Sequence, residues 1–137
     1  MAEHLLDTSA VFALLDDEPG ADEVQRLLDG AAAGGPRVFL CTFTLMEVYY
    51  VSLQEKGETE AARLIALIKS WPIQWAAPTE KDLLRGGRFK AFHRVSFADA
   101  AIAAVACARR ATLVHKDPEL EALADEVALL TLPYKGR

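Results

Sequence analysis

The sequence predicts an α/β fold, a three-layer α/β/α sandwich around a central and mainly parallel sheet. Short apolar segments alternate with longer amphipathic ones, which is the order expected when each helix carries the chain back across a sheet. The 137 residues are 52% hydrophobic and 26% charged, a composition typical of a globular chain. This length fits one domain, which we expect to span residues 1–137.

The first part of the chain predicts two strands and two helices. His4–Asp7 predicts a strand, and Ser9–Leu15 predicts a short helix. Gly20–Ala33 has the apolar spacing of a helix, and a Gly-Gly-Pro sequence ends it. Val38–Thr42 is rich in β-branched and aromatic residues and predicts the second strand.

The middle of the chain predicts three helices and a strand. Thr44–Lys56 and Glu58–Trp71 each place apolar residues at helical spacing, and a glycine ends the first while a proline ends the second. Ile73–Ala76 predicts a strand. Thr79–Phe92 predicts a helix although it contains two adjacent glycines, each of which costs roughly 1 kcal/mol relative to alanine.

The last part begins with the most apolar segment, Phe97–Arg110, which predicts a buried helix too short to span a bilayer. Thr112–His115 predicts a strand, Pro118–Asp125 a helix and Val127–Thr131 a final strand. The N-terminal residues show no signal peptide, and both cysteines lie in apolar runs, which is typical of thiols in a reducing compartment. We therefore expect a soluble, cytoplasmic protein without a membrane partner.

Four acidic residues each lie at the start of a predicted helix, namely Asp7, Glu47, Asp99 and Asp117. Three of them directly follow a predicted strand. Ligands of a parallel sheet bind beyond the carboxyl ends of its strands, so these carboxylates converge on one rim if their strands share a sheet. Spacing alone does not prove that convergence.

Each acid also has a simpler interpretation as a helix cap. Thr44 and Glu47 have the spacing of a capping box, and Asp117 precedes a proline in the manner of an N-cap. Negative charge at the start of a helix also interacts favourably with the helix dipole. For any one acid taken alone, capping is the better explanation, and the functional interpretation depends on the set.

A converging set of four carboxylates would need a cation. The carboxylates would repel one another strongly, and a bound divalent ion removes that repulsion. Oxygen ligands without a histidine or cysteine cluster favour Mg²⁺ or Mn²⁺ over zinc. Such an ion activates water and holds the oxygens of a phosphodiester, so we expect a metal-dependent hydrolase acting on phosphodiester bonds.

Four segments resemble the PIN-domain nucleases, and in particular the VapC-type toxins of type II toxin–antitoxin pairs. The segments are HLLDTSAVFALL, TFTLMEVYY, SFADAAIAAVA and ATLVHKDPELEAL, and their order and spacing fit nearly the whole chain. The resemblance implies a PIN-like fold and a Mg²⁺- or Mn²⁺-dependent endoribonuclease that cleaves single-stranded RNA. It also implies a homodimer and inhibition by a small antitoxin protein.

Each of the four acids matches an acidic position of the PIN-domain family. Asp7 and Asp99 match the principal metal ligands of the family. Glu47 matches an acid that helps to bind the metal or to orient water, and Asp117 matches a fourth, more variable acid. All four are therefore the expected catalytic and metal-binding residues.

Two neighbouring positions also match. The hydroxyl after the first acid, from Thr8 or Ser9, matches a position that supports the site by hydrogen bonding. His115 stands where many relatives have Thr or Ser, and we expect it to have a structural partner rather than to contact a phosphate.

A basic segment leads into the helix that carries Asp99. Residues 81–116 have eight basic and two acidic side chains, in a chain whose formal net charge is -5. The candidates for contact with RNA phosphates are Arg85, Arg88, Lys90 and Arg94. Phe89 and Phe92 lie between them and are more typical of a core than of base stacking.

A second surface is expected to bind protein. The helical pair between Tyr49 and Leu67 has apolar residues at consecutive positions, more than one neighbouring element can bury. We expect part of it to contact either a second copy of the chain or an antitoxin.

Two other functions stay open. The chain could be an RNA-processing PIN nuclease without an antitoxin, or a catalytically silent PIN-like binding module whose acids only cap helices. A haloacid-dehalogenase-type phosphatase needs a second acid two residues after the first, where this chain has Ser9. A nucleotide-binding module is unsupported because neither GxGxxG nor a Walker A sequence is present.

Overall fold

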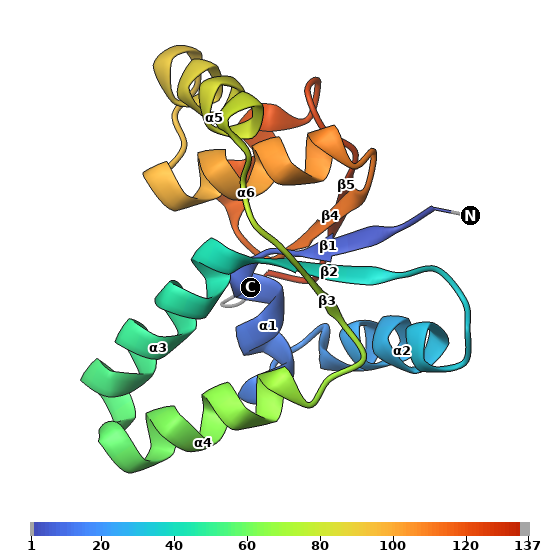
Figure 1. The fold of residues 1–137 in the computed structure, drawn as a ribbon, viewed down its shortest axis with the longest axis vertical. Coiled ribbons are helices and arrows are strands. Elements are labelled where there is room, and N and C mark those ends of the chain that lie inside the picture. Colours follow the sequence, from blue (N-terminus) through green and yellow to red (C-terminus); the bar gives the residue numbers. More distant parts are fainter. Residues whose placement is uncertain (1, 135–137) are drawn as a thin grey trace.

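A five-stranded sheet forms the centre of the computed structural model, which describes residues 2–134. The strand order is β3-β2-β1-β4-β5, and every neighbouring pair is parallel (Figure 1). The strands are β1 (His4–Leu6), β2 (Val38–Cys41), β3 (Gln74–Ala76), β4 (Thr112–His115) and β5 (Leu129–Thr131). The predicted parallel α/β fold is therefore confirmed.

Helices cover both faces of this sheet (Figure 1). The helices of one group are α1 (Thr8–Leu15), α2 (Ala21–Ala32), α3 (Thr42–Lys56) and α4 (Glu58–Lys69). The other face carries α5 (Glu80–Phe92), α6 (Phe97–Ala108) and the 3₁₀ helix η1 (Pro118–Leu123). No helix in the described part of the chain is both long and apolar enough to cross a membrane.

The hydrophobic core has two layers, one on each face of the sheet, because side chains alternate in direction along the strands. Leu5 of the central strand packs with the cluster that contains α6, whereas Leu6 packs with the cluster that contains α1 and α2. Successive side chains of a strand point to opposite faces of the sheet, which produces this division. The alanine-rich face of α6 is almost fully buried, as the apolar composition of that segment predicted.

The structure corrects two element boundaries that affect the site. Helix α3 begins at Thr42, two residues earlier than predicted, so Thr44 lies inside the helix and caps nothing. The predicted capping box of Thr44 and Glu47 is therefore wrong. The helix predicted over residues 118–125 is a shorter 3₁₀ helix, in which Pro118 occupies the first position after the N-cap.

The two adjacent glycines are part of α5, which Thr79 and Asp82 begin with a capping box. Gly86 is buried against α6, and a Cβ atom there would lie 3.3 Å from the carbonyl oxygen of Ala100. Its lack of a side chain lets the two helices approach closely, whereas Gly87 faces open space. This contact fixes α5 beside the start of α6, where Asp99 lies.

Candidate metal and active site

The four predicted acids lie at the carboxyl edge of the sheet. Asp7 follows β1, Asp117 follows β4 and Glu47 lies on α3, which begins directly after β2. These three strands are neighbours in the sheet, so their ends share one rim. Asp99, on the first turn of α6, reaches the same rim. Asp7 is 1% exposed and Asp99 6% exposed, while Glu47 and Asp117 are half-buried.

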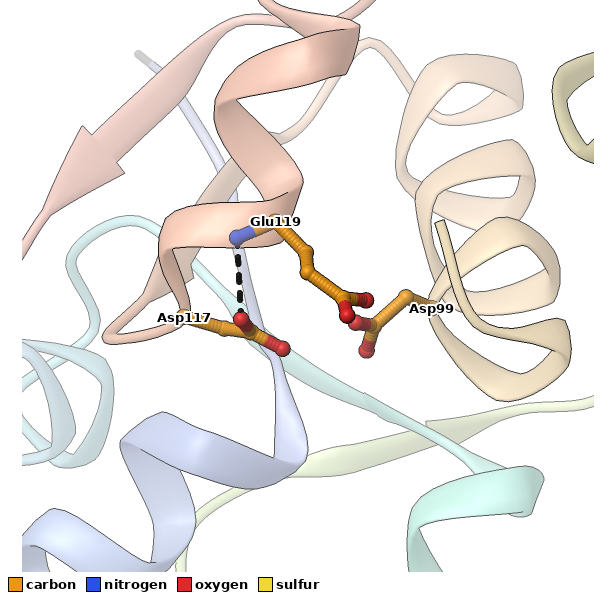
Figure 2. Close-up of side chains that lie close together, drawn as sticks. All are labelled: Asp99, Asp117 and Glu119. Atoms are coloured by element: carbon orange, nitrogen blue, oxygen red, sulfur yellow. Dashed lines mark hydrogen bonds between the residues drawn. The ribbon is translucent and has the colours of Figure 1, made fainter. Parts of the chain in front are cut away.

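A carboxylate that the sequence analysis missed joins this set. One carboxylate oxygen each from Asp99, Asp117 and Glu119 lie within 4.8 Å of one another, as Figure 2 shows. Glu119 is exposed, and its backbone N–H donates to Asp117 Oδ1 at 3.0 Å. An acid two residues after Asp117 is the sequence signal, but its proximity to Asp99 of α6 is seen only in the folded chain.

Asp7 is held through one of its two oxygens. Its Oδ2 accepts hydrogen bonds from the backbone N–H of Ser9 at 3.0 Å and from the Ser9 hydroxyl at 2.6 Å. Its Oδ1 is buried and accepts no hydrogen bond from an N–H or hydroxyl group within residues 2–134, and the carboxyl group of Asp99 lies beside Asp7. A buried carboxylate oxygen without a partner is costly unless a ligand satisfies it. This atom, with the surrounding carboxylates, fits the oxygen ligands that Mg²⁺ and Mn²⁺ prefer.

Capping and clustering occur together at this rim. Asp7 is the N-cap of α1 and Asp117 is the N-cap of η1, as their positions predicted. Each cap uses a single carboxylate oxygen, which leaves the other oxygen free for the cluster. Ser96 caps α6 with its own hydroxyl by accepting from the Asp99 N–H at 3.2 Å.

The two predicted supporting hydroxyls hold different acids. The Ser9 hydroxyl donates to Asp7 and accepts from the backbone N–H of Lys116 at 2.8 Å, which ties the end of β1 to the residue before Asp117. Thr8 Oγ1 donates to Glu47 Oε1 at 2.5 Å.

Thr44 completes this second contact from within α3. Its hydroxyl lies 3.0 Å from that of Thr8. Because Thr8 gives its only proton to Glu47, Thr44 is the donor of this pair. The two threonines therefore connect the helix that follows β1 to the helix that carries Glu47.

Burial and mutual repulsion disturb the protonation of these acids. Burial is the main reason that the pKa of Asp99 rises to about 9, and the carboxyl groups of Asp7 and Asp117 raise it further. Burial likewise raises the pKa of Asp7, against the hydrogen bonds from Ser9 that lower it. The pKa of Glu47 is also raised, chiefly by burial, while its hydrogen bond from Thr8 opposes that shift.

These shifts predict how the stability of the metal-free protein depends on pH. An acid whose pKa is higher in the folded state binds more protons there, so stability falls as pH rises between the unfolded and folded pKa values. For Asp99 this window runs from the ordinary pKa of an aspartate, 3.8, to about 9. We expect the melting temperature in chelator to fall from about pH 5 to about pH 8, and Asp99→Asn to flatten that slope. If the melting temperatures of the wild type and of Asp99→Asn changed equally with pH, the raised pKa of Asp99 would be contradicted.

His115 has the structural partners that its position suggested. It is fully buried, its Nδ1 accepts from the Asp117 N–H at 3.1 Å, and its Nε2 lies 2.9 Å from Thr131 Oγ1. Because Nδ1 is an acceptor, the ring proton lies on Nε2 and is donated to Thr131. The ring thus holds the backbone of Asp117 against β5 and has no exposed atom for a phosphate.

The basic segment divides between two hollows. Lys90 and Arg94 line a hollow of about 350 Å³ with Ser96 and Glu119, next to the acidic cluster. Lys90 Nζ also donates to the carbonyl oxygen of Val95 at 2.7 Å.

Arg85 and Arg88 line a different hollow, together with Cys107 near the far end of α6. The structure therefore brings only half of the predicted RNA contacts to the acids. Phe89 is buried as predicted, but Phe92 is 71% exposed, so its assignment to the core is wrong.

The comparisons with known proteins identify the family and the fold. The PIN domain family model matches residues 4–126. The fold is similar to VapBC2 from Rickettsia felis bound to a promoter DNA fragment, with a TM-score of 0.77, 17% identity, and 95% of this chain and 98% of that chain covered.

Two further solved structures share the fold. DNA-bound VapBC from Salmonella typhimurium has a TM-score of 0.75 at 18% identity, over 96% of this chain and 98% of that chain. VapC20 from Mycobacterium tuberculosis, a toxin that cleaves the sarcin-ricin loop, has a TM-score of 0.69 at 20% identity, over 88% and 94% of the two chains. A search of curated proteins finds no match.

Proposed function

The chain belongs to the PIN-domain family, and from this premise we propose that it is a metal-dependent endoribonuclease for single-stranded RNA and the toxin of a toxin–antitoxin pair. The observation that carries the proposal is the buried Oδ1 of Asp7, which lacks a partner beside carboxylates from two other elements. Capping alone leaves that atom unexplained. The VapC toxins that share this fold support the choice of RNA as substrate.

The acids divide into ligands and a base. Asp7, Asp99 and Asp117 would hold a Mg²⁺ or Mn²⁺ ion, and Glu119 offers a further oxygen from the exposed side of the cluster. When bound, such an ion lowers the pKa of water and stabilises negative charge on a phosphodiester. Glu47 is oriented by Thr8 and its pKa is raised, which suits a carboxylate that accepts the proton of the attacking water.

Cationic side chains lie where the substrate would enter. Lys90 and Arg94 line the hollow beside Glu119, and their charges compensate for the acids as an RNA phosphate approaches. The hydrogen bond from Lys90 to Val95 limits the movement of its ammonium group. Neither residue lies within the buried part of the cluster, so both serve in binding rather than in the proton transfer.

Cleavage of a labelled single-stranded RNA by the purified protein tests the proposal. We expect cleavage when Mg²⁺ or Mn²⁺ is added and none in chelator, with the corresponding DNA and a fully paired RNA as comparison substrates. Cleavage that persists in chelator would contradict the metal requirement. Binding of RNA without cleavage under any metal condition would favour the silent binding module.

An apolar groove between α3 and α4 is the proposed site for an antitoxin. It has a volume of about 630 Å³ and contains Leu45, Met46, Tyr49 and Ile65. Met46 is 62% exposed and lies with the other apolar side chains of the groove, so together they form a contiguous apolar surface. An amphipathic helix of an antitoxin suits a groove of this kind. The VapBC complexes that share the fold support such a partner.

A separate apolar face is the proposed contact between two copies of the chain. Phe97 is 74% exposed and stacks on Phe43, with ring centroids 6.5 Å apart. Beside it lies an apolar hollow of about 350 Å³ between α5 and α6, and Leu83 stands half exposed at this hollow. This face adjoins the start of α6, so a dimer formed there would bring two acidic sites near one interface.

Substitutions on the two surfaces should have separate effects. We expect Phe97→Glu to dissociate the dimer, and Met46→Glu to prevent inhibition by the cognate antitoxin, because each places a charge in an apolar contact. Light scattering reports the first effect, and RNA cleavage titrated with antitoxin reports the second. Each variant is the control for the other. A dimer that survives Phe97→Glu, or full inhibition of Met46→Glu, would contradict the corresponding surface.

A further inference from the structure

The hollow that contains Arg85 and Arg88 lies apart from the acidic site. It has a volume of about 460 Å³, and the middle and C-terminal turns of α5 and the end of α6 form its walls. Its lining residues are Leu84, Arg85, Arg88, Phe89, Phe92, His93, Cys107 and Glu126. Cys107 stands eight positions after Asp99 on α6, which corresponds to about 12 Å along the helix axis.

The arginines of this hollow lack anionic partners. Among the described residues, no carboxylate forms an ion pair with the guanidinium of Arg85 or Arg88. On α2 and α4, by contrast, Arg26 and Arg63 are paired with glutamates. The acid of the hollow, Glu126, lies 3.5 Å from His93, and its backbone oxygen accepts from the Cys107 thiol. Two positive charges are therefore available to a bound anion.

An exposed aromatic ring stands beside these charges. Phe92 is 71% exposed, and the guanidinium of Arg88 lies over its ring at 5.4 Å from the centroid. Phe89 closes the floor of the hollow and is buried. A cation next to an open aromatic face is the combination that binds single-stranded nucleic acid, because bases stack on the ring while arginine contacts phosphate.

We propose that this hollow binds a nucleotide of the single-stranded RNA outside the cleavage point, with its base on Phe92 and adjacent phosphates on Arg85 and Arg88. This inference rests on the proposed function for the choice of RNA. It assigns the two arginines to a second contact, separate from the Lys90 and Arg94 hollow beside the acids. The RNA would then extend from the acidic rim along α6.

Charge favours RNA over a protein partner at this place. The chain as a whole has a formal net charge of -5, whereas residues 81–94 have five basic side chains and one acidic side chain. Such an asymmetry guides a polyanion to the basic face. The hollow also differs from the α3–α4 groove, which is lined mostly by apolar residues.

Binding of single-stranded RNA without cleavage tests the inference. The anisotropy of a labelled RNA of about twelve nucleotides is measured with the whole chain in chelator, over a range of salt concentrations. The arginine double variant Arg85→Ala, Arg88→Ala is expected to bind more weakly and to lower the slope of log K against log salt by about 1.4, since each phosphate contact contributes about 0.7. Phe92→Leu is expected to weaken binding roughly fivefold or more with the slope unchanged.

Matched variants elsewhere serve as controls. Arg63→Ala removes an exposed arginine of α4, and Tyr50→Leu removes an exposed aromatic ring of α3. Both are expected to bind RNA as the wild type does. All variants are compared in their melting temperature and light scattering, so that misfolding or a changed oligomeric state is recognised.

The outcomes separate this inference from the proposed function. Unchanged affinity and slope in the hollow variants would overturn the inference, as would wild-type protein that binds no RNA. If Phe92→Leu changed the dimer into a monomer but kept its RNA affinity, the inference would be overturned, and Phe92 would instead belong to a contact between two copies of the chain. If the variants lose RNA affinity but the wild type never cleaves RNA with metal, the inference stands and the proposed nuclease function fails.

Discussion

Asp7→Asn and Asp99→Asn are each expected to reduce RNA cleavage by about a hundredfold or more while leaving a folded protein. Asn retains a side-chain carbonyl that can accept the hydrogen bonds from Ser9, so the cap of α1 survives at position 7. Each substitution removes the negative charge of a carboxylate, and a divalent cation needs that charge in its ligands. Both side chains are almost fully buried, and water therefore replaces neither of them easily.

Initial rates of cleavage, measured against Mg²⁺ and Mn²⁺ concentration, check this prediction. Asp125→Asn is the matched control, because Asp125 is an exposed acid outside the cluster. Retention of more than roughly a tenth of the wild-type rate by either site variant would contradict a metal-binding role. A loss of activity in Asp125→Asn as well would point to a general effect of charge.

Binding of the metal ion is expected to have the second large effect, on stability. In the metal-free site, burial raises the pKa values of Asp7 and Asp99, and the neighbouring carboxyl groups add to that shift. A ligand that binds only the folded state stabilises it by RT ln(1 + [L]/Kd), or about 2.7 kcal/mol at a hundred times Kd. Wild-type protein is therefore expected to melt at a higher temperature with millimolar Mn²⁺ than in chelator.

The order of strands and helices could be predicted from the sequence, because it depends mainly on the local spacing of apolar residues and on the positions of glycine and proline. The carboxyl ends of β1, β2 and β4 then follow from parallel pairing, and with them the common rim of Asp7, Glu47 and Asp117. The exact start of α3 could not be predicted in this way. Thr44 looked like a cap from its spacing, whereas a tertiary contact with Thr8 is what determines its place.

Other features depend on contacts that no local pattern encodes. Glu119 joins the acids because the first turn of η1 lies beside the start of α6, a tertiary contact that the spacing of the residues does not show. The exposure of Phe92 depends on which side of α5 packs against α6, and that choice follows from the close approach at Gly86. His115 likewise has its partners in Thr131 of β5 and in the backbone N–H of Asp117.

The melting temperatures of wild type and Asp99→Asn, each with and without Mn²⁺, test the clustered metal site most directly and need no substrate. In chelator near neutral pH, Asp99→Asn is expected to melt above the wild type, because it removes a buried carboxyl group that the folded protein must keep protonated. With Mn²⁺ the wild type should gain most of the stabilisation and Asp99→Asn little of it. Identical melting temperatures in chelator together with no response of the wild type to millimolar Mn²⁺ would show that the acids only cap their helices, and the nuclease assignment would fall with the metal site.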